Sequence, residues 1–357
     1  MTRTSVQVGG RVVGESAPCF VTYEAGPTHS GLDSAKTLVR HAAEAGADAV
    51  KFQILDPDRL VADRKLPFSY DVLVDRATGR TETVTEPLYD ILCRRTLTGA
   101  EWRELKSYSD SLKLAFFGTV MFDDEVDFVV GLGCHSIKIS SADLNHHPLL
   151  RKAARTGLNI QLDTGNGTLE EMQSAVDILL GEGNDNIIIH HCPSGYPARL
   201  PSINLRVITT LRQMFSYPIA YSDHTPGWDM DIAAIALGAS LVEKTITLDR
   251  TTRSVEHVMS LEPGDMHRFL RVVRDLEIAL GSPRRVMQPE EIKKRQAVRR
   301  SMYLKAAAKA GTRLSDTMLD FRRPGFGIGP EMYDLLAERK LKADLPAGHL
   351  LSMADLS

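Results

Sequence analysis

The chain has 357 residues, of which 43% are hydrophobic and 25% charged, the balance of an ordinary globular protein. This length is too great for one ordinary domain and fits a large barrel followed by a small module. A formal net charge of −3 gives no electrostatic reason to expect nucleic acid or an anionic membrane as a partner. The four cysteines form no CxxC pair, which argues against a disulfide framework or a structural zinc site. With no signal-peptide core and no apolar run of about 18 residues, we expect a cytoplasmic protein without a membrane segment.

Short β-rich segments alternate with helical stretches over most of the chain. Predicted strands lie at residues 20–26, 49–54, 115–120, 136–141, 159–165, 187–192, 218–224 and 241–247. Predicted helices between them lie at residues 34–46, 99–112, 168–183 and 228–239. The strands begin with apolar residues and end with polar ones, as parallel strands covered by helices do. Eight such units predict the α/β class and a (β/α)8 TIM barrel; an open doubly wound sheet is the alternative, but no GxGxxG loop supports it.

Segments outside this alternation define the rest of the chain. VQVGGRVVG (6–14) predicts a short hairpin that could plug the barrel floor. The polar stretch 56–87 predicts an irregular loop that shapes the barrel mouth. We therefore expect a barrel over residues 1–281, a charged linker over 282–296, and a small β-rich domain over 297–357.

A ring of polar residues follows the predicted strands, at the end where a (β/α)8 barrel carries its active site. Three of them are lysines (Lys51, Lys138 and Lys244), and a lysine inside a strand is costly to bury unpaired. They could be barrel filler, paired with carboxylates of the ring. Alternatively, they form a positive cup for phosphate and carboxylate, completed by hydroxyl donors. A Schiff-base lysine is a third possibility. Other members of the ring are Glu24, Gln53, Thr119, Ser141, Asp163, Asn166, Ser194, Ser222, Asp223 and Glu243.

Histidines near the ends of two strands are candidate metal ligands. His224 could join Asp223 and neighbouring carboxylates in an octahedral Mn²⁺ or Mg²⁺ site, although a plain hydrogen-bonding role is equally open. Of His190 and His191, only one can point into the barrel, because successive strand residues face opposite sides. Strand parity favours His191.

Seven collinear blocks resemble the sialic acid synthases and their legionaminic and pseudaminic acid relatives, and they cover nearly the whole chain. They are EAGPTHSG (24–31), AGADAVKFQ (45–53), SIKISSADLNHHPLL (136–150), HCPSGYP (191–197), YSDHTPG (221–227), VEKTITLDR (242–250) with SLEP (260–263), and RRPGFGIGP (322–330). The resemblance implies a catalytic (β/α)8 barrel followed by an antifreeze-like (SAF) domain. It also implies a divalent metal, usually manganese, and a domain-swapped homodimer.

The resemblance also implies roles for individual residues. His224 would bind the metal, and Arg323 would reach across the dimer to the partner's substrate. Residues implied to hold phosphoenolpyruvate are Lys51, Thr119, Lys138, Ser141, Ser194 and Ser222. Residues implied to face the sugar are Glu24, Gln53, Asp143, Tyr196 and Glu256.

Several positions depart from the family's usual pattern. Thr245 stands where the family has a second metal histidine, and Asp163 introduces an acid in a block that usually reads STG. Ser194 replaces an asparagine, Glu256 replaces an aspartate, and the block GTVMF (118–122) has lost a proline. These changes leave the identity of the sugar open.

We therefore expect a C–C bond-forming transferase that condenses phosphoenolpyruvate with a sugar aldehyde, such as an amino sugar like N-acetylmannosamine. The product would be a nonulosonic, sialic-acid-like 3-deoxy-2-keto acid. The alternatives are a metal-dependent or Schiff-base pyruvate aldolase and a catalytically silent sugar-binding homologue.

Overall fold

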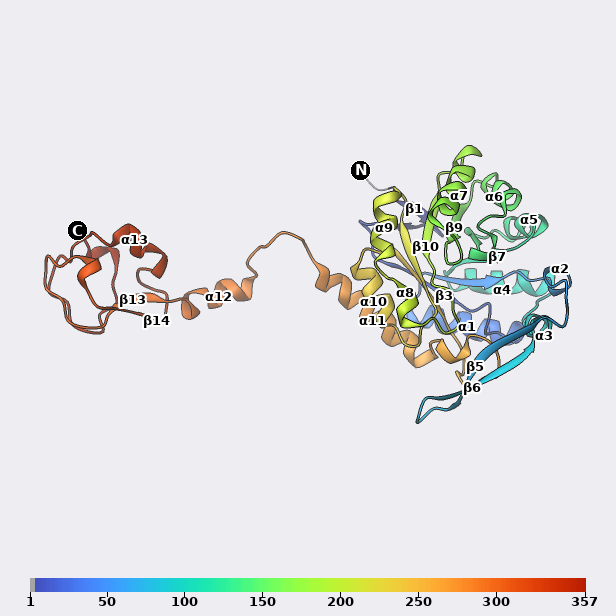
Figure 1. The fold of residues 1–357 in the computed structure, drawn as a ribbon, viewed down its shortest axis with the longest axis horizontal. Helices are drawn as coiled ribbons and strands as arrows, with labels where there is room; N and C mark the ends of the chain where they lie inside the picture. Colours follow the sequence, from blue (N-terminus) through green and yellow to red (C-terminus); the bar gives the residue numbers. More distant parts are fainter. Residues whose placement is uncertain (1–3) are drawn as a thin grey trace. The chain divides into compact units, whose positions relative to one another are not determined.

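The computed structural model describes residues 4–357, which divide after Gly281 into two compact units. Each unit has a hydrophobic core of its own. The first unit contains the predicted barrel (Figure 1). Of the helices in residues 4–357, none combines the length and apolar character that crossing a bilayer requires.

Eight parallel strands close into a barrel in chain order, which confirms the predicted fold class. The strands are β3 (Phe20–Glu24), β4 (Ala49–Gln53), β7 (Ala115–Val120), β8 (Ser136–Ile139), β9 (Asn159–Asp163), β10 (Ile187–His191), β11 (Ile219–Asp223) and β12 (Leu241–Thr245). Register places Glu24 at the end of β3 between Lys51 of β4 and Thr245 of β12. Side chains that sequence separates by more than 200 residues therefore meet at one edge of the barrel.

A ring of helices covers the outer face of the sheet (Figure 1). Capping boxes at Thr98 and Thr168 begin two of them, because each threonine accepts from the backbone three residues on while a glutamate reaches back. The longer helices are α1 (Leu32–Ala45), α4 (Gly99–Ser111), α5 (Asp123–Gly131), α6 (His147–Ala154), α7 (Leu169–Gly181), α9 (Val207–Met214), α10 (Asp229–Ala236) and α11 (Pro263–Leu280). Shorter ones are α2 (Pro57–Leu60), α3 (Leu88–Cys93) and α8 (Leu200–Ile203). All four predicted helices are present.

The N-terminal hairpin closes the barrel floor, as predicted. Strands β1 (Val6–Val8) and β2 (Arg11–Val13) pair through a turn in which Gly9 and Gly10 have φ of 56° and 78°. Glycine adopts these positive angles without a steric penalty. The valines of the hairpin pack with inward-facing residues from the start of the barrel strands, including Phe20, Phe117 and Leu241.

The prediction of an irregular loop over residues 56–87 is wrong. Two long antiparallel strands, β5 (Pro67–Asp75) and β6 (Arg80–Pro87), form a hairpin there. Tyr70 and Val72 of the hairpin pack against Ile91 of α3 and against Val255. The hairpin is therefore a fixed part of the barrel unit.

The second unit covers residues 282–357. Its elements are α12 (Pro289–Val298), β13 (Ser301–Leu304), β14 (Leu319–Arg322) and α13 (Tyr333–Leu336). Helix α12 thus begins inside the segment predicted as linker. The backbone N–H of Gly325 donates to the carbonyl oxygen of Gln296 at 2.6 Å, which ties the helix to the small β-rich fold. Met302, Leu304 and Leu351 lie in its core.

Candidate active site

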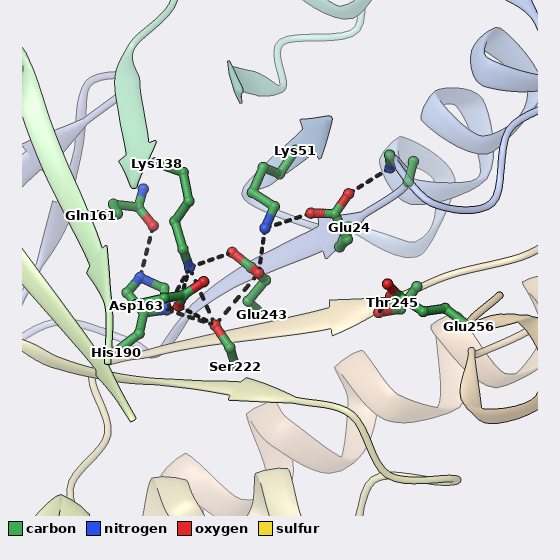
Figure 2. Close-up of polar contacts among 12 residues, drawn as sticks. Glu24, Lys51, Lys138, Gln161, Asp163, His190, Ser222, Glu243, Thr245 and Glu256 are labelled. Carbon is green, nitrogen blue, oxygen red and sulfur yellow. Dashed lines mark hydrogen bonds and ion pairs between the residues drawn. The ribbon is translucent and has the colours of Figure 1, made fainter. Parts of the chain in front are cut away.

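A buried polar layer lies above the apolar floor of the barrel, on the inward face of the strands (Figure 2). It follows from strand alternation, since Leu241, Glu243 and Thr245 of β12 all face inward while Val242 and Lys244 face the helices. The layer lies at the carboxyl ends of the strands, where catalytic residues of such barrels are found. Its members are Glu24, Lys51, Lys138, Gln161, Asp163, His190, Ser222 and Glu243.

Lys51 and Lys138 converge on one carboxylate, that of Glu243. The Lys51 ammonium lies 2.6 Å from Glu243 Oε1 and 2.5 Å from Glu24 Oε2. The Lys138 ammonium lies 3.0 Å from Glu243 Oε2 and 2.8 Å from Asp163 Oδ1. Burial alone would raise the pKa of Glu243, yet the charges of Lys138 and Lys51 hold it below its usual range. The two ammonium groups are thus neighbours, as an anion site requires, but both are already paired.

His190 completes the layer as an uncharged ring. Its Nε2 lies 2.9 Å from Gln161 Oε1, so Nε2 carries the proton and Nδ1 accepts from Lys138 at 3.0 Å; Ser222 Oγ lies 2.9 Å from the same nitrogen. Burial, and then the Lys138 charge, lower the pKa of His190 to about 3. His190 therefore orients the lysine without adding positive charge.

The predicted positive cup of three lysines is wrong. Lys244 faces away from the barrel interior, where it pairs with Asp223 and lies 3.6 Å from Asp231 under helix α10. The interior layer holds two ammonium groups and three carboxylates, so its charge is about −1 when all are ionised. Lys138 stays protonated, because the charges of Asp163 and Glu243 outweigh the effect of burial and raise its pKa.

Two further predictions fail for the same reason, strand parity. Asp223 shares the outward face with Lys244, so it cannot join a metal or substrate in the barrel. His191 also faces outward, where its Nε2 lies 2.6 Å from the carbonyl oxygen of Ile203. His190 points inward instead. Sequence reasoning missed Gln161, chose His191 over His190, and gave Glu243 no role beyond membership of the polar ring. The register between neighbouring strands, which places Gln161 opposite the inward-facing Lys138, could have corrected the first of these.

A chain of polar groups lines the rim above Asp163. Asn166 donates to Ser141 Oγ at 3.1 Å and accepts from Ser194 Oγ at 3.0 Å. Asn166 and Ser194 are exposed and Ser141 is half-buried. The structure thus brings together three residues of the predicted polar ring.

His224 and Tyr196 form the opposite part of the rim. Their rings lie 4.7 Å apart, and His224 Nδ1 lies 3.1 Å from the carbonyl oxygen of Pro193. Since a carbonyl accepts, Nδ1 carries the proton and Nε2 has the free lone pair that a metal would use. No three His, Cys, Asp or Glu side chains within residues 4–357 gather in a way that could hold a metal ion. A divalent cation at His224 would therefore take most of its ligands from substrate and water.

The remaining predicted residues lie around the mouth or outside this unit. Glu256 accepts from Thr245 Oγ1 at 3.3 Å, apart from the lysine cluster in Figure 2, and has φ of 72°, an unusual backbone angle for glutamate. Glu24 Oε1 accepts from the backbone N–H of Gly26 at 2.5 Å, and a Cβ on Gly26 would clash with that oxygen. By parity, Gln53 and Thr119 share the inward face with Lys51 and Phe117.

The last two predicted site residues are Asp143 of the barrel unit and Arg323 of the second unit. Asp143 accepts from Ser140 at 2.9 Å, and burial raises its pKa. Arg323 belongs to the second unit, where it is exposed.

Comparison with known proteins places this site in a family. Residues 38–285 match the NeuB family. The chain belongs to the NeuB family. Its NeuB relatives include N,N'-diacetyllegionaminic acid synthase of Legionella pneumophila, which is 33% identical over 95% of this chain and 94% of the relative. Human N-acetylneuraminate-9-phosphate synthase is also 33% identical, over 87% of this chain and 84% of its own length.

A solved NeuB structure has the same architecture. The sialic acid synthetase of Leptospira borgpetersenii, crystallised with citrate, superimposes with a TM-score of 0.71 at 27% identity and covers 82% of this chain and 95% of its own. Relatives named as synthases of sialic, legionaminic and pseudaminic acids confirm the resemblance drawn from the sequence motifs. The chain is thus related to enzymes that make nonulosonic acids.

Proposed function

We propose that this protein condenses phosphoenolpyruvate with a sugar aldehyde to a nonulosonic 3-deoxy-2-keto acid and releases phosphate. The observation that carries the proposal is the pair of buried ammonium groups, Lys51 and Lys138, held side by side on Glu243. Phosphoenolpyruvate carries a phosphate and a carboxylate, so it needs two or more cations in one pocket. An arriving anion can use these ammonium groups by displacing the carboxylates of Asp163 and Glu24.

The proposed reaction proceeds in two steps on adjacent carbons. C3 of phosphoenolpyruvate attacks the aldehyde carbon, which forms the C–C bond, takes a proton to the aldehyde oxygen and leaves positive charge at C2. Water adds to C2 and loses a proton, and C2–O cleavage then releases phosphate and leaves the ketone. Glu24 is the nearest carboxylate to Lys51, at 2.5 Å, and we assign it the proton transfers or the orientation of the sugar.

We also propose that turnover requires Mn²⁺ or Mg²⁺ held by His224 through Nε2, with no other protein ligand from residues 4–357. A bound divalent cation would polarise the aldehyde. The measurement is metal content of the purified protein and activity with a chelator, with Mn²⁺ or with Mg²⁺. Full activity in the chelator with no bound metal would remove this part of the proposal.

We propose a homodimer on the basis of the family resemblance. In a domain-swapped homodimer, residues 297–357 of one subunit would cover the barrel mouth of the other, with Arg323 reaching its substrate.

A phosphate-release assay with phosphoenolpyruvate and a panel of aldoses and amino sugars tests the proposed function. We expect phosphate only when both reactants are present. A pyruvate aldolase would release none, and its Schiff-base form is disfavoured because Asp163 and Glu243 keep Lys138 protonated. Binding of sugars without turnover under any metal condition would favour the silent homologue.

A further inference from the structure

Arg95, just after helix α3, is a buried cation that the proposed chemistry does not use. Only 8% of the residue is exposed. Its Nε and Nη1 atoms are buried and have no hydrogen-bond partner among residues 4–357, and no ion pair joins it to a carboxylate there. Its neighbour Arg94, by contrast, is paired with Glu86 on the surface. A guanidinium stays charged in proteins and has five N–H donors, so a buried one without acceptors lacks its usual compensation.

Arg95 follows Ile91 of helix α3 by four residues, and Ile91 packs in one cluster with Val255, the residue before Glu256. Burial, and then the Arg95 charge, lower the pKa of His29 to about 4. The same charge acts on His257, and Glu256 and Tyr196 act on Arg95 in turn. The packing of α3 on Val255 and these charge interactions together place Arg95 close to the loop that carries Glu256.

Two of these neighbours are groups implied to face the sugar. Glu256 is held in its unusual backbone conformation and has Thr245 as its hydrogen-bond donor. Tyr196 is 41% exposed, packs its ring against that of His224 at an interplanar angle of 57°, and lines a groove of about 530 Å³ between its own loop and the β5–β6 hairpin. A ligand that contacts these two side chains comes within reach of the electrostatic field of Arg95.

We propose that Arg95 binds an anionic oxygen group, a carboxylate or a phosphate, on the aldehyde substrate. The inference rests on the proposed function, in which phosphoenolpyruvate uses Lys51 and Lys138 and the aldehyde occupies the rim. An anion supplies both the charge and the multiple acceptors that a planar guanidinium lacks here. The substrate class is thus an acidic sugar, either a sugar phosphate or a sugar acid.

Thermal-shift binding tests this inference without turnover. The full-length protein is heated with mannose, mannose 6-phosphate and mannuronate, and with the corresponding glucose series. We expect at least one anionic sugar to raise the melting temperature and to bind at least about tenfold more tightly than its neutral parent, as a charge-assisted hydrogen bond allows. A response to the phosphate but not the acid, or the reverse, identifies the anion. No preference for either anion over the neutral sugar would overturn the inference.

Substitutions at two adjacent arginines provide the matched comparison. R95M should abolish the preference for the anionic sugar, R95K should retain part of it, and R94M should leave it unchanged. R95M should also melt at a higher temperature than the wild type without ligand, since it removes an uncompensated buried charge. If R95M keeps the anion preference, Arg95 is a structural residue and the inference fails.

A phosphate-release assay distinguishes failure of the role proposed for Arg95 from failure of the proposed function. If the wild type releases phosphate with a neutral aldose as efficiently as with its acidic counterpart, the synthase activity stands and the role of Arg95 is refuted. If anionic sugars bind through Arg95 but no phosphate is released with any of them, the binding site stands and the synthase proposal fails.

Discussion

Asp163→Asn should strengthen phosphoenolpyruvate binding, because the Asp163 carboxylate competes for the proposed anion site. Its Oδ1 lies 2.8 Å from Lys138 Nζ and 3.1 Å from Ser222 Oγ, the two donors that an incoming anion would use. Two oxygens that share one ammonium at such distances are roughly 4.5 Å apart, and like charges at that separation repel by about 4 kcal/mol at an effective dielectric constant near 20. Solvent and rearrangement reduce this figure, so we expect about 1.4 kcal/mol or more, which is about tenfold in affinity.

The assay is calorimetric binding of phosphoenolpyruvate without aldehyde, so that a catalytic role of Asp163 does not obscure the result. Asp223→Asn is the matched control, since Asp223 is also a buried partner of a lysine but faces out of the barrel. It should lower stability and leave phosphoenolpyruvate affinity unchanged. Equal or weaker binding by Asp163→Asn would refute the reasoning and show that Asp163 helps to hold Lys138 in place for the ligand.

Other perturbations separate the site from its scaffold. Lys138→Met should weaken phosphoenolpyruvate binding about tenfold to a hundredfold, whereas Lys244→Met should destabilise the barrel with little change in affinity; equal effects on affinity would contradict the assignment of faces. Barrel stability should fall on acidification from pH 6.5 towards 4, by up to about 1.4 kcal/mol per pH unit for each buried neutral histidine, because the unfolded chain then binds more protons than the native one. The histidines are His29, His190 and His257, whose pKa values are lowered to about 3 or 4. Chemical denaturation at several pH values measures the free energy of unfolding, and a value that does not change with pH would contradict the prediction. Deleting residues 297–357 should abolish phosphate release while the barrel still melts cooperatively, and retained activity would refute the proposed covering of the mouth by a second subunit.

The barrel could be predicted from sequence because its signal is repeated eight times. Each strand is a short apolar run, and each is followed by a helix or a longer excursion. The polar layer could be located for the same reason, since chain order alone places the carboxyl ends of parallel strands at one edge. Lys51, Lys138 and Ser222 were found in this way.

The inward or outward direction of adjacent polar residues was harder to predict. Both faces of a barrel strand are buried, so β10 and β12 show no alternation of apolar and polar residues. Glu243 and Lys244 therefore look equivalent in sequence, as do His190 and His191. Only a fixed reference such as an inward-facing neighbour decides between them.

The sequence could not predict which distant side chains pair with one another. Glu243 lies between two lysines that are 192 and 105 residues away. Nothing near Arg95 in the sequence marks it as buried, because the charged and polar residues that act on it, His29, Tyr196, Glu256 and His257, come from three other segments. The β5–β6 hairpin was missed because its polar residues resemble those of a loop, although Gly79 marks the turn.

The valine hairpin at the base of the barrel has a consequence for the order in which ligands bind and leave. Strands β1 and β2 fill that end of the barrel. As far as residues 4–357 show, a small molecule can therefore reach Lys138 only from the rim. If the proposed function holds, phosphoenolpyruvate at the lysines would therefore bind before the sugar at the rim. In the proposed reaction, phosphate formed beside the lysines would leave after the keto acid product, because both would leave through the same opening.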